Sequence, residues 1–130
     1  MSDNPDSRSG LELAYIGDAI FELMVRERIF AEGTSRAGRL HSRSVALVCA
    51  PAQAAMAGAI EPLLDEKEHA VFLRGRNAHP KTVSKAASHA DYMRATALEA
   101  LFGWLHLTGQ VARIKELFEL AMDTASNLNK

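Results

Sequence analysis

Two carboxylates are the residues of this sequence best suited to chemistry, because each lies alone in an apolar stretch. Asp18 lies in AYIGDAIF, and Glu99 lies in ATALEALFGWL. A glycine accompanies each acid, Gly17 in the first stretch and Gly103 in the second. Burying an unpaired carboxylate is costly. We therefore expect each acid to be either exposed to solvent or paired with another group.

The glycines favour a paired arrangement. Glycine inside a helix costs about 1 kcal/mol relative to alanine, which makes sense at Gly17 if another backbone or a ligand comes close. Carboxylates on antiparallel neighbouring helices can share a divalent cation. Two acids are too few to surround Ca²⁺, but they suit Mg²⁺, or Mn²⁺ in its place, which keeps several waters and takes phosphate oxygens from a substrate. The alternatives are that Asp18 is an ordinary solvent-facing residue and that Glu99 pairs structurally with an arginine such as Arg94.

Charge is segregated along the chain, although the formal net charge of the 130 residues is only −1. Residues 33–60 and 69–90 contain no acid, yet both segments are rich in arginine, lysine and histidine. Such segregation can present a basic strip to a phosphate backbone, whereas a solvated loop is the alternative for the second segment. The candidate nucleic-acid contacts there are Arg74, Arg76, Asn77, Lys81 and Lys85.

Other kinds of site find no support in the sequence. The five histidines lack zinc-ligand spacing, and Cys49 is the one cysteine. Phosphate-binding, dinucleotide-binding and serine-hydrolase motifs are absent. No apolar run has the length of a membrane span, and the N-terminal residues MSDNPDSRSG lack the apolar core of a signal peptide. A lone cysteine favours a reducing compartment, so we expect a cytoplasmic protein.

Apolar residues recur at spacings of three and four, which predicts helices and no strands. Six helices are expected in an all-α domain that spans residues 10–127, after a disordered tail of residues 1–9. The segment RGRNAHPKTVSKAASH (74–89) is predicted to be a loop. The expected helices are Leu11–Ala31 with Ser9 as N-cap, Ser35–Ala50 after a Thr34 cap, one from Pro51 to about Pro62, one from Asp65 with Glu68 as capping-box partner, Ala90–Leu107, and Val111–Ala125.

The apolar stripes of these helices predict the core. In the first helix the expected stripe is Leu13, Ile16, Ile20 and Leu23, continued by Ile29 or Phe30. A different face is marked by Tyr15, Asp18 and Val25, among others. Later stripes are Val45, Leu47 and Val48; Val71, Phe72 and Leu73; Leu98, Leu101 and Leu105 with Trp104 beside them; and Val111, Ile114, Leu117, Phe118 and Ala121.

Three motifs together resemble the compact branch of the ribonuclease III family, Mini-ribonuclease III. They are LAYIGDAIFELMVR (13–26), FLRGRNAH (72–79) and ATALEALFGWLHLTG (95–109). The resemblance covers roughly residues 11–121. It implies the helical ribonuclease III fold and a symmetric homodimer, with Asp18 and Glu99 as the catalytic, metal-binding acids. Tyr15 falls where the family places an aromatic dimer contact.

The resemblance also implies a function: Mg²⁺-dependent cleavage of double-stranded RNA that leaves 5′-phosphate and 3′-hydroxyl ends, with a ribosomal RNA precursor as the substrate. Larger relatives carry further acids where this chain has Ala14 and Thr96, which leaves open whether Glu12 or Glu22 assists. The reduced set of acids keeps a second hypothesis open, a non-catalytic dimer that binds structured RNA or ribosomal particles. A third is a helical protein-interaction module.

Overall fold

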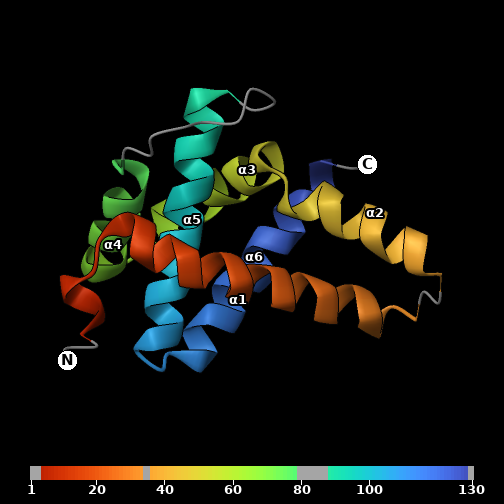
Figure 1. The fold of residues 1–130 in the computed structure, drawn as a ribbon, viewed down its shortest axis with the longest axis horizontal. Helices are drawn as coiled ribbons and strands as arrows, with labels where there is room; N and C mark the ends of the chain where they lie inside the picture. Colours follow the sequence, from red (N-terminus) through yellow and green to blue (C-terminus); the bar gives the residue numbers. More distant parts are fainter. Residues whose placement is uncertain (1–3, 34–35, 79–87, 129–130) are drawn as a thin grey trace.

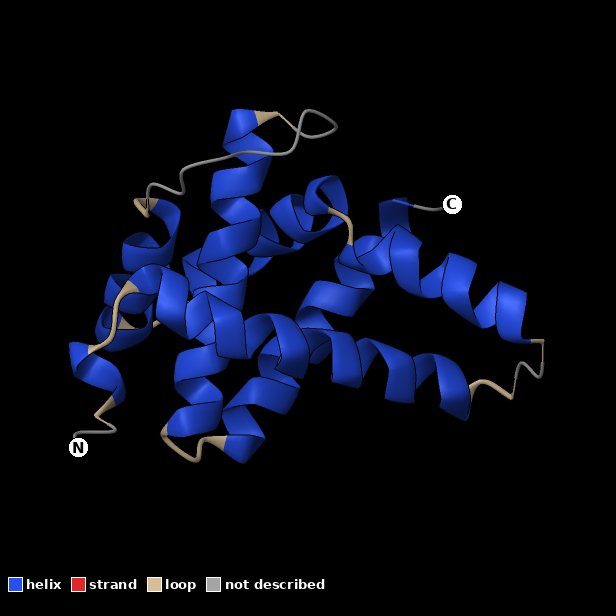
Figure 2. Ribbon diagram, in the orientation of Figure 1, coloured by secondary structure: helices blue, strands red, loops and turns tan. Residues whose placement is uncertain are grey.

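The computed structural model describes residues 4–33, 36–78 and 88–128, and within these ranges all the regular secondary structure is helical, with no strand (Figure 2). The all-α prediction is therefore confirmed. The α-helices are α1 (Gly10–Ala31), α2 (Ala37–Val48), α3 (Ala50–Ile60), α4 (Glu66–Arg76), α5 (His89–Leu107) and α6 (Val111–Leu128), with the short 3₁₀ helices η1 (Pro5–Ser7) and η2 (Glu61–Leu63).

Helix α5 is the centre of the domain. It packs against α1, α3 and α4, and α1 crosses in front of it while α2 and the second half of α1 extend together to one side (Figure 1). Its residues 95–98 and 100–105 are all buried, including the predicted stripe of Leu98, Leu101 and Leu105. Only a helix covered on several sides buries so continuous a run.

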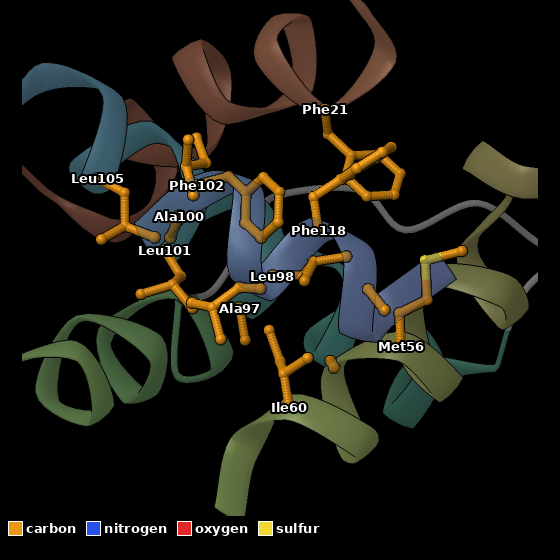
Figure 3. Close-up of a cluster of buried hydrophobic side chains, with 14 of the residues drawn as sticks. Phe21, Met56, Ile60, Ala97, Leu98, Ala100, Leu101, Phe102, Leu105 and Phe118 are labelled. Carbon is orange, nitrogen blue, oxygen red and sulfur yellow. The ribbon is translucent and has the colours of Figure 1, made fainter. Parts of the chain in front are cut away.

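Aromatic rings tie α5 to its neighbours within this core (Figure 3). Phe21 of α1 meets Phe102 of α5 edge to face, with ring centroids 5.6 Å apart, and Phe118 of α6 at 5.9 Å. Edge-to-face contacts of this kind add about 1 kcal/mol to the free energy of area burial. The three helices are thus fixed against one another next to the first carboxylate motif.

The predicted helix starts follow local capping signals. Ser9 and Glu12 form a capping box at α1, with both hydrogen bonds at 3.1 Å, and Asp65 and Glu68 form the same motif at α4. Ser88 caps α5 by accepting a hydrogen bond from the Asp91 amide. The predicted Thr34 cap lies outside the described residues, and the N-cap of α2 is Arg36, without a side-chain cap.

The predicted core face of α1 is partly wrong. Leu23 and Phe30 are exposed, at 54% and 79% of their surface, whereas Phe21 and Val25 are fully buried. Leu13, Gly17, Phe21 and Val25 follow one another at intervals of four residues, and this stripe faces the core. The reason is that Gly17 faces α5 at the point where the two helices cross. Phe21 and Val25 lie one and two turns further along the same side of α1, so they also face the core. Val45 and Val111, also predicted to be in the core, are likewise exposed.

Two segments predicted to be irregular have structure. Residues 4–9, part of the predicted disordered tail, contain η1, and the Trp104 indole nitrogen donates a 2.8 Å hydrogen bond to the Asp6 carboxylate. The predicted loop begins later than expected, because Arg74, Gly75 and Arg76 belong to the last turn of α4. Gly75 sits against the α5 backbone, where an added Cβ would lie 2.9 Å from the Thr96 carbonyl oxygen. Helix packing therefore extends α4 beyond its apolar run.

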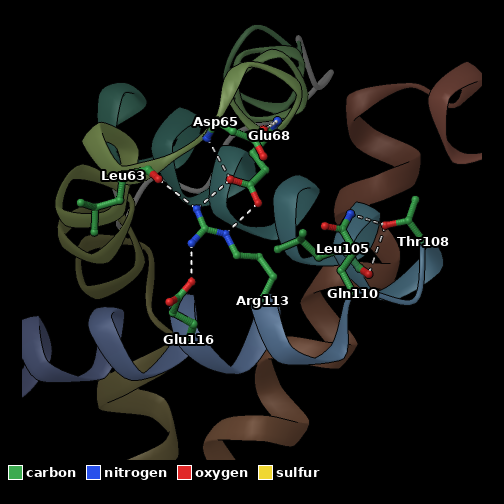
Figure 4. Close-up of polar contacts among 8 residues, drawn as sticks. All are labelled: Leu63, Asp65, Glu68, Leu105, Thr108, Gln110, Arg113 and Glu116. Atoms are coloured by element: carbon green, nitrogen blue, oxygen red, sulfur yellow. Dashed lines mark hydrogen bonds and ion pairs between the residues drawn. The ribbon is translucent and has the colours of Figure 1, made fainter.

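Helix α4 is joined to α6 by a buried ion pair (Figure 4). Glu68 is 2% exposed, and both of its carboxylate oxygens accept hydrogen bonds of 2.8 Å from the Arg113 guanidinium. Arg113 also donates to the Leu63 carbonyl oxygen at 2.9 Å and pairs with Glu116. The guanidinium beside Glu68 holds the pKa of that carboxyl below its ordinary value. Two helices that are distant in sequence are thereby locked together.

No single described helix is long and apolar enough to cross a membrane, and only the bent pair Ala37–Val48 and Ala50–Leu63 meets that test by length and composition.

Candidate active site

The crossing of α1 and α5 brings the two carboxylate motifs together. A Cβ atom added at Gly17 would lie 1.6 Å from the Glu99 carbonyl oxygen, and one added at Gly103 would lie 2.0 Å from the Leu13 carbonyl oxygen. The two backbones therefore touch at these glycines, which no larger residue would permit. The close approach predicted from Gly17 is real, and its partner is backbone rather than a ligand.

Asp18 and Glu99 interact directly at this crossing. Asp18 is exposed on α1, and Glu99 is partly buried on α5. Burial, followed by the hydrogen bond and the negative charge of Asp18, raises the pKa of Glu99 from 4.5 to about 8. A metal-free site near neutral pH therefore holds a proton between two acids that would otherwise repel each other. Such a pair can bind a cation or exchange a proton.

A third side chain, which the sequence did not reveal, reaches the same carboxyl group. Gln53 of α3 is 3% exposed, and its hydrogen bond to Glu99 partly opposes the rise of that pKa. Because this interaction lowers the pKa of Glu99, it favours the ionised carboxylate, so the Gln53 amide nitrogen is the donor. The available signal was that this glutamine is the one polar side chain in the stretch PAQAAMAGAI. That pattern places a polar group on a helix but says nothing of its partner.

The donor set fits a divalent cation that keeps most of its own water. Within the described ranges, no group of three or more His, Cys, Asp or Glu side chains could hold a metal ion. Two neighbouring carboxylates with open solvent on the Asp18 side match the way Mg²⁺ is bound in proteins, through one or two acids, waters and phosphate oxygens. The cation would replace the proton that separates the two acids.

The other acids near α1 have different partners. Glu12 belongs to the α1 capping box and pairs with Arg8 at 2.8 Å, while Glu22 pairs with Arg26 at 3.1 Å. The two positions where larger relatives carry acids are buried. Ala14 is 7% exposed, and Thr96 is 5% exposed with its hydroxyl donating to the Tyr92 carbonyl oxygen. The candidate site therefore consists of Asp18 and Glu99, the two acids that interact at the crossing.

The predicted nucleic-acid contacts differ in their surroundings. Arg74 donates hydrogen bonds to the backbone carbonyl oxygens of Arg8 at 2.8 Å and Asp6 at 3.3 Å, so it holds the N-terminal segment. Arg76 also lies in the last turn of α4, and Asn77 is the exposed residue that ends this helix. Lys81 and Lys85 lie outside the described residues.

Tyr15 lies on the exposed side of α1, with 80% of its surface accessible. It borders an apolar groove of about 640 Å³ that Leu11, Ile16 and Leu107 also line. Leu11 and Leu107 are more than 40% exposed themselves. An apolar surface of this kind is typical of a site for another protein.

Known proteins are similar to this chain in both sequence and fold. A family model described as "Ribonuclease III domain" matches residues 11–110. The chain is 42% identical over 120 residues to Mini-ribonuclease 3 of Symbiobacterium thermophilum, covering 92% of each protein, and 37% identical to Mini-ribonuclease 3 of Enterococcus faecalis, covering 94% of each. A crystal structure of a Fusobacterium nucleatum protein superposes with a TM-score of 0.85 at 32% identity, covering 94% of this chain and 99% of that one. The chain therefore belongs to the ribonuclease III family of endoribonucleases and is similar to its Mini-ribonuclease 3 members over almost its whole length.

Proposed function

We propose that this chain is a Mg²⁺-dependent endoribonuclease that cuts double-stranded RNA, with residues 10–127 as its catalytic domain. The observation that carries the proposal is the carboxyl pair of Asp18 and Glu99 at the glycine crossing, where burial and the charge of Asp18 raise the pKa of Glu99 to about 8. A carboxyl pair kept so close is favourable for binding a cation and unfavourable without one.

Asp18 and Glu99 would hold Mg²⁺, or Mn²⁺ in its place. When bound, the cation would lower the pKa of a coordinated water and polarise the scissile phosphate. Asp18, which is exposed, leaves one side of the site open to an RNA backbone, while Glu99 is anchored on the most buried helix of the domain. Cleavage would leave a 5′ phosphate and a 3′ hydroxyl.

The RNA would be recognised by its shape and phosphates, as is usual for duplex RNA. The proposed contacts are Arg76, Asn77, Lys81 and Lys85, together with Arg74. Because Arg74 already donates to two backbone carbonyl groups, its substitution should also lower stability. Binding through phosphates should weaken steeply with salt.

Two sites would act together in a symmetric homodimer, with Tyr15 at the subunit contact. The exposed apolar groove beside Tyr15 supports this arrangement, because contact with a second copy would remove Leu11 and Leu107 from water. We further propose a ribosomal RNA precursor as the natural substrate and the cytoplasm as the location, by analogy with the family and from the single cysteine.

The test is cleavage of a long RNA duplex with and without Mg²⁺ by the wild type and by Asp18→Asn and Glu99→Gln. Both variants should lose cleavage and keep the helical circular dichroism spectrum. The two-carboxylate site is sparse, which favours one competing function, a non-catalytic dimer that binds structured RNA. Metal-independent RNA binding without cleavage by the wild type would establish that function, and full activity in both variants would refute the metal assignment.

A further inference from the structure

We propose that the N-terminal segment, residues 4–9, orients the Arg74 side chain for a phosphate group of the RNA, and that Asp6 and Trp104 are positioning residues that act through this segment. The inference rests on the proposed function, in which Arg74 contacts RNA. It gives a role in RNA binding to a segment that the sequence predicted to be disordered.

The N-terminal segment is fixed at two points. On α5, the Trp104 indole nitrogen donates a 2.8 Å hydrogen bond to the Asp6 carboxylate. Trp104 is 6% exposed, and a buried indole N–H needs an acceptor, which Asp6 supplies from 98 positions away. The segment then enters α1 at Gly10, where an added Cβ would lie 2.4 Å from the Arg74 carbonyl oxygen. This stretch of backbone therefore lies against the last turn of α4, on the side of the domain where the chain begins (Figure 1).

Two carbonyl groups of this fixed segment hold the Arg74 side chain. The Arg74 Nη1 atom donates to the carbonyl oxygen of Arg8 at 2.8 Å and to that of Asp6 at 3.3 Å. Both acceptors are uncharged, and no carboxylate of the described residues forms an ion pair with Arg74. The guanidinium is thus oriented while its positive charge stays unneutralised. Other arginines pair instead with glutamates: Arg8, Arg26, Arg28, Arg43 and Arg113.

An arginine held in this way is prepared for a phosphate. Both hydrogen bonds of Arg74 use Nη1, whereas Nη2 and Nε form none with the described residues and can donate to phosphate oxygens. Ordering one flexible side chain at an interface weakens binding by about 2–10-fold. The N-terminal segment orders Arg74 before RNA arrives, so binding avoids this loss. Trp104 is buried, so its effect on RNA must pass through the segment.

The test is binding of a labelled RNA duplex, measured by fluorescence anisotropy in EDTA so that no metal-dependent cleavage occurs. Trp104→Phe keeps a buried ring and removes the donor, and Asp6→Ala removes the acceptor, so each should raise the Kd about 2–10-fold. Asp6→Asn keeps an oxygen that can accept from the indole and should bind as the wild type does. Asp123→Ala, which removes an exposed carboxylate from α6, is the control and should also bind like the wild type.

Salt dependence separates an orienting role from the loss of a phosphate contact. Arg76→Gln removes a proposed contact, so it should reduce the slope of log Kd against log salt concentration by about 1. Trp104→Phe and Asp6→Ala remove no phosphate contact, so their slopes should equal the wild-type slope although binding is weaker. Asp6 is exposed, so Asp6→Ala tests the proposal even if Trp104→Phe fails to fold.

The outcomes also separate this inference from the proposed function. If Arg76→Gln weakens binding and lowers the slope while Trp104→Phe and Asp6→Ala bind like the wild type, the orienting role is wrong and the RNA contacts stand. If neither Arg74→Gln nor Arg76→Gln changes RNA binding, the proposed contacts fail and this inference fails with them. Tighter binding by both Asp6→Ala and Asp6→Asn would show that the charge of Asp6 matters rather than its bond to Trp104, and would overturn the inference.

Discussion

Replacing Glu99 by glutamine should make the metal-free protein more stable at neutral pH. In the folded chain, burial and Asp18 raise the pKa of Glu99 to about 8, whereas its ordinary value is 4.5. Between these two values the folded state keeps a proton that the unfolded state has released. The free energy of unfolding therefore falls as pH rises, by about 1.4 kcal/mol for each pH unit. Glutamine is neutral at every pH, so the variant does not lose stability as the pH rises.

The size of the effect follows from the interval between the two pKa values. From 4.5 to pH 7 the difference is about 2.5 units, which corresponds to up to about 3 kcal/mol. Glu99→Gln should thus match the wild type near pH 4, exceed its stability increasingly up to pH 8, and keep a constant advantage above it. Mg²⁺ should close the gap, because a cation between Asp18 and Glu99 stabilises only the wild type.

The assay is urea unfolding in EDTA from pH 4 to 9, followed by circular dichroism at one fixed protein concentration. Glu27→Gln, an exposed change on α1, is the control for removing a carboxylate. A difference in stability between Glu99→Gln and the wild type that does not change with pH would contradict the raised pKa of Glu99. That outcome would mean that Glu99 is neither buried nor beside Asp18 in solution.

Two further predictions concern the scaffold that holds the site. Gly17→Ala should destabilise the fold by about 3 kcal/mol, because its Cβ would meet the Glu99 carbonyl oxygen. The control Gly58→Ala, at an open position, should raise the melting temperature slightly. Equal melting temperatures for the two variants would contradict the close crossing of α1 and α5. Arg113→Met should cost about 3–5 kcal/mol at pH 7, because it leaves the Glu68 carboxylate buried and unpaired. The pKa of Glu68 is lowered in the folded state, so the ion pair stabilises the fold above about pH 4.5 and this stabilisation is lost on acidification. Urea unfolding should therefore show that Arg113→Met loses less stability, relative to the wild type, near pH 4 than at pH 7. A larger loss near pH 4 would contradict the role of the ion pair.

The sequence alone was sufficient for the features that depend on neighbouring residues. Ser9 with Glu12, and Asp65 with Glu68, mark helix starts because a capping box closes within four residues. Gly109, with φ of 72°, follows the C-cap of α5, and a glycine just after a helix is likewise a local signal that the sequence carries. The two carboxylates stood out because a charge in an apolar run needs a partner, whatever the fold.

Only the tertiary structure decided which surfaces meet. Helix α1 carries apolar residues on more than one side, so its periodicity could not show that Phe21 rather than Leu23 faces the core. The contact of Gln53 with Glu99 joins residues 46 positions apart, and no local pattern encodes such a pair. The hydrogen bonds of a helix cap form within one turn of the chain. Side-chain packing and buried hydrogen bonds between helices instead depend on which helix lies opposite in the folded protein. The sequence therefore determined the helices and the two acids, and the crossing of α1 and α5 at paired glycines decided that these acids share one site.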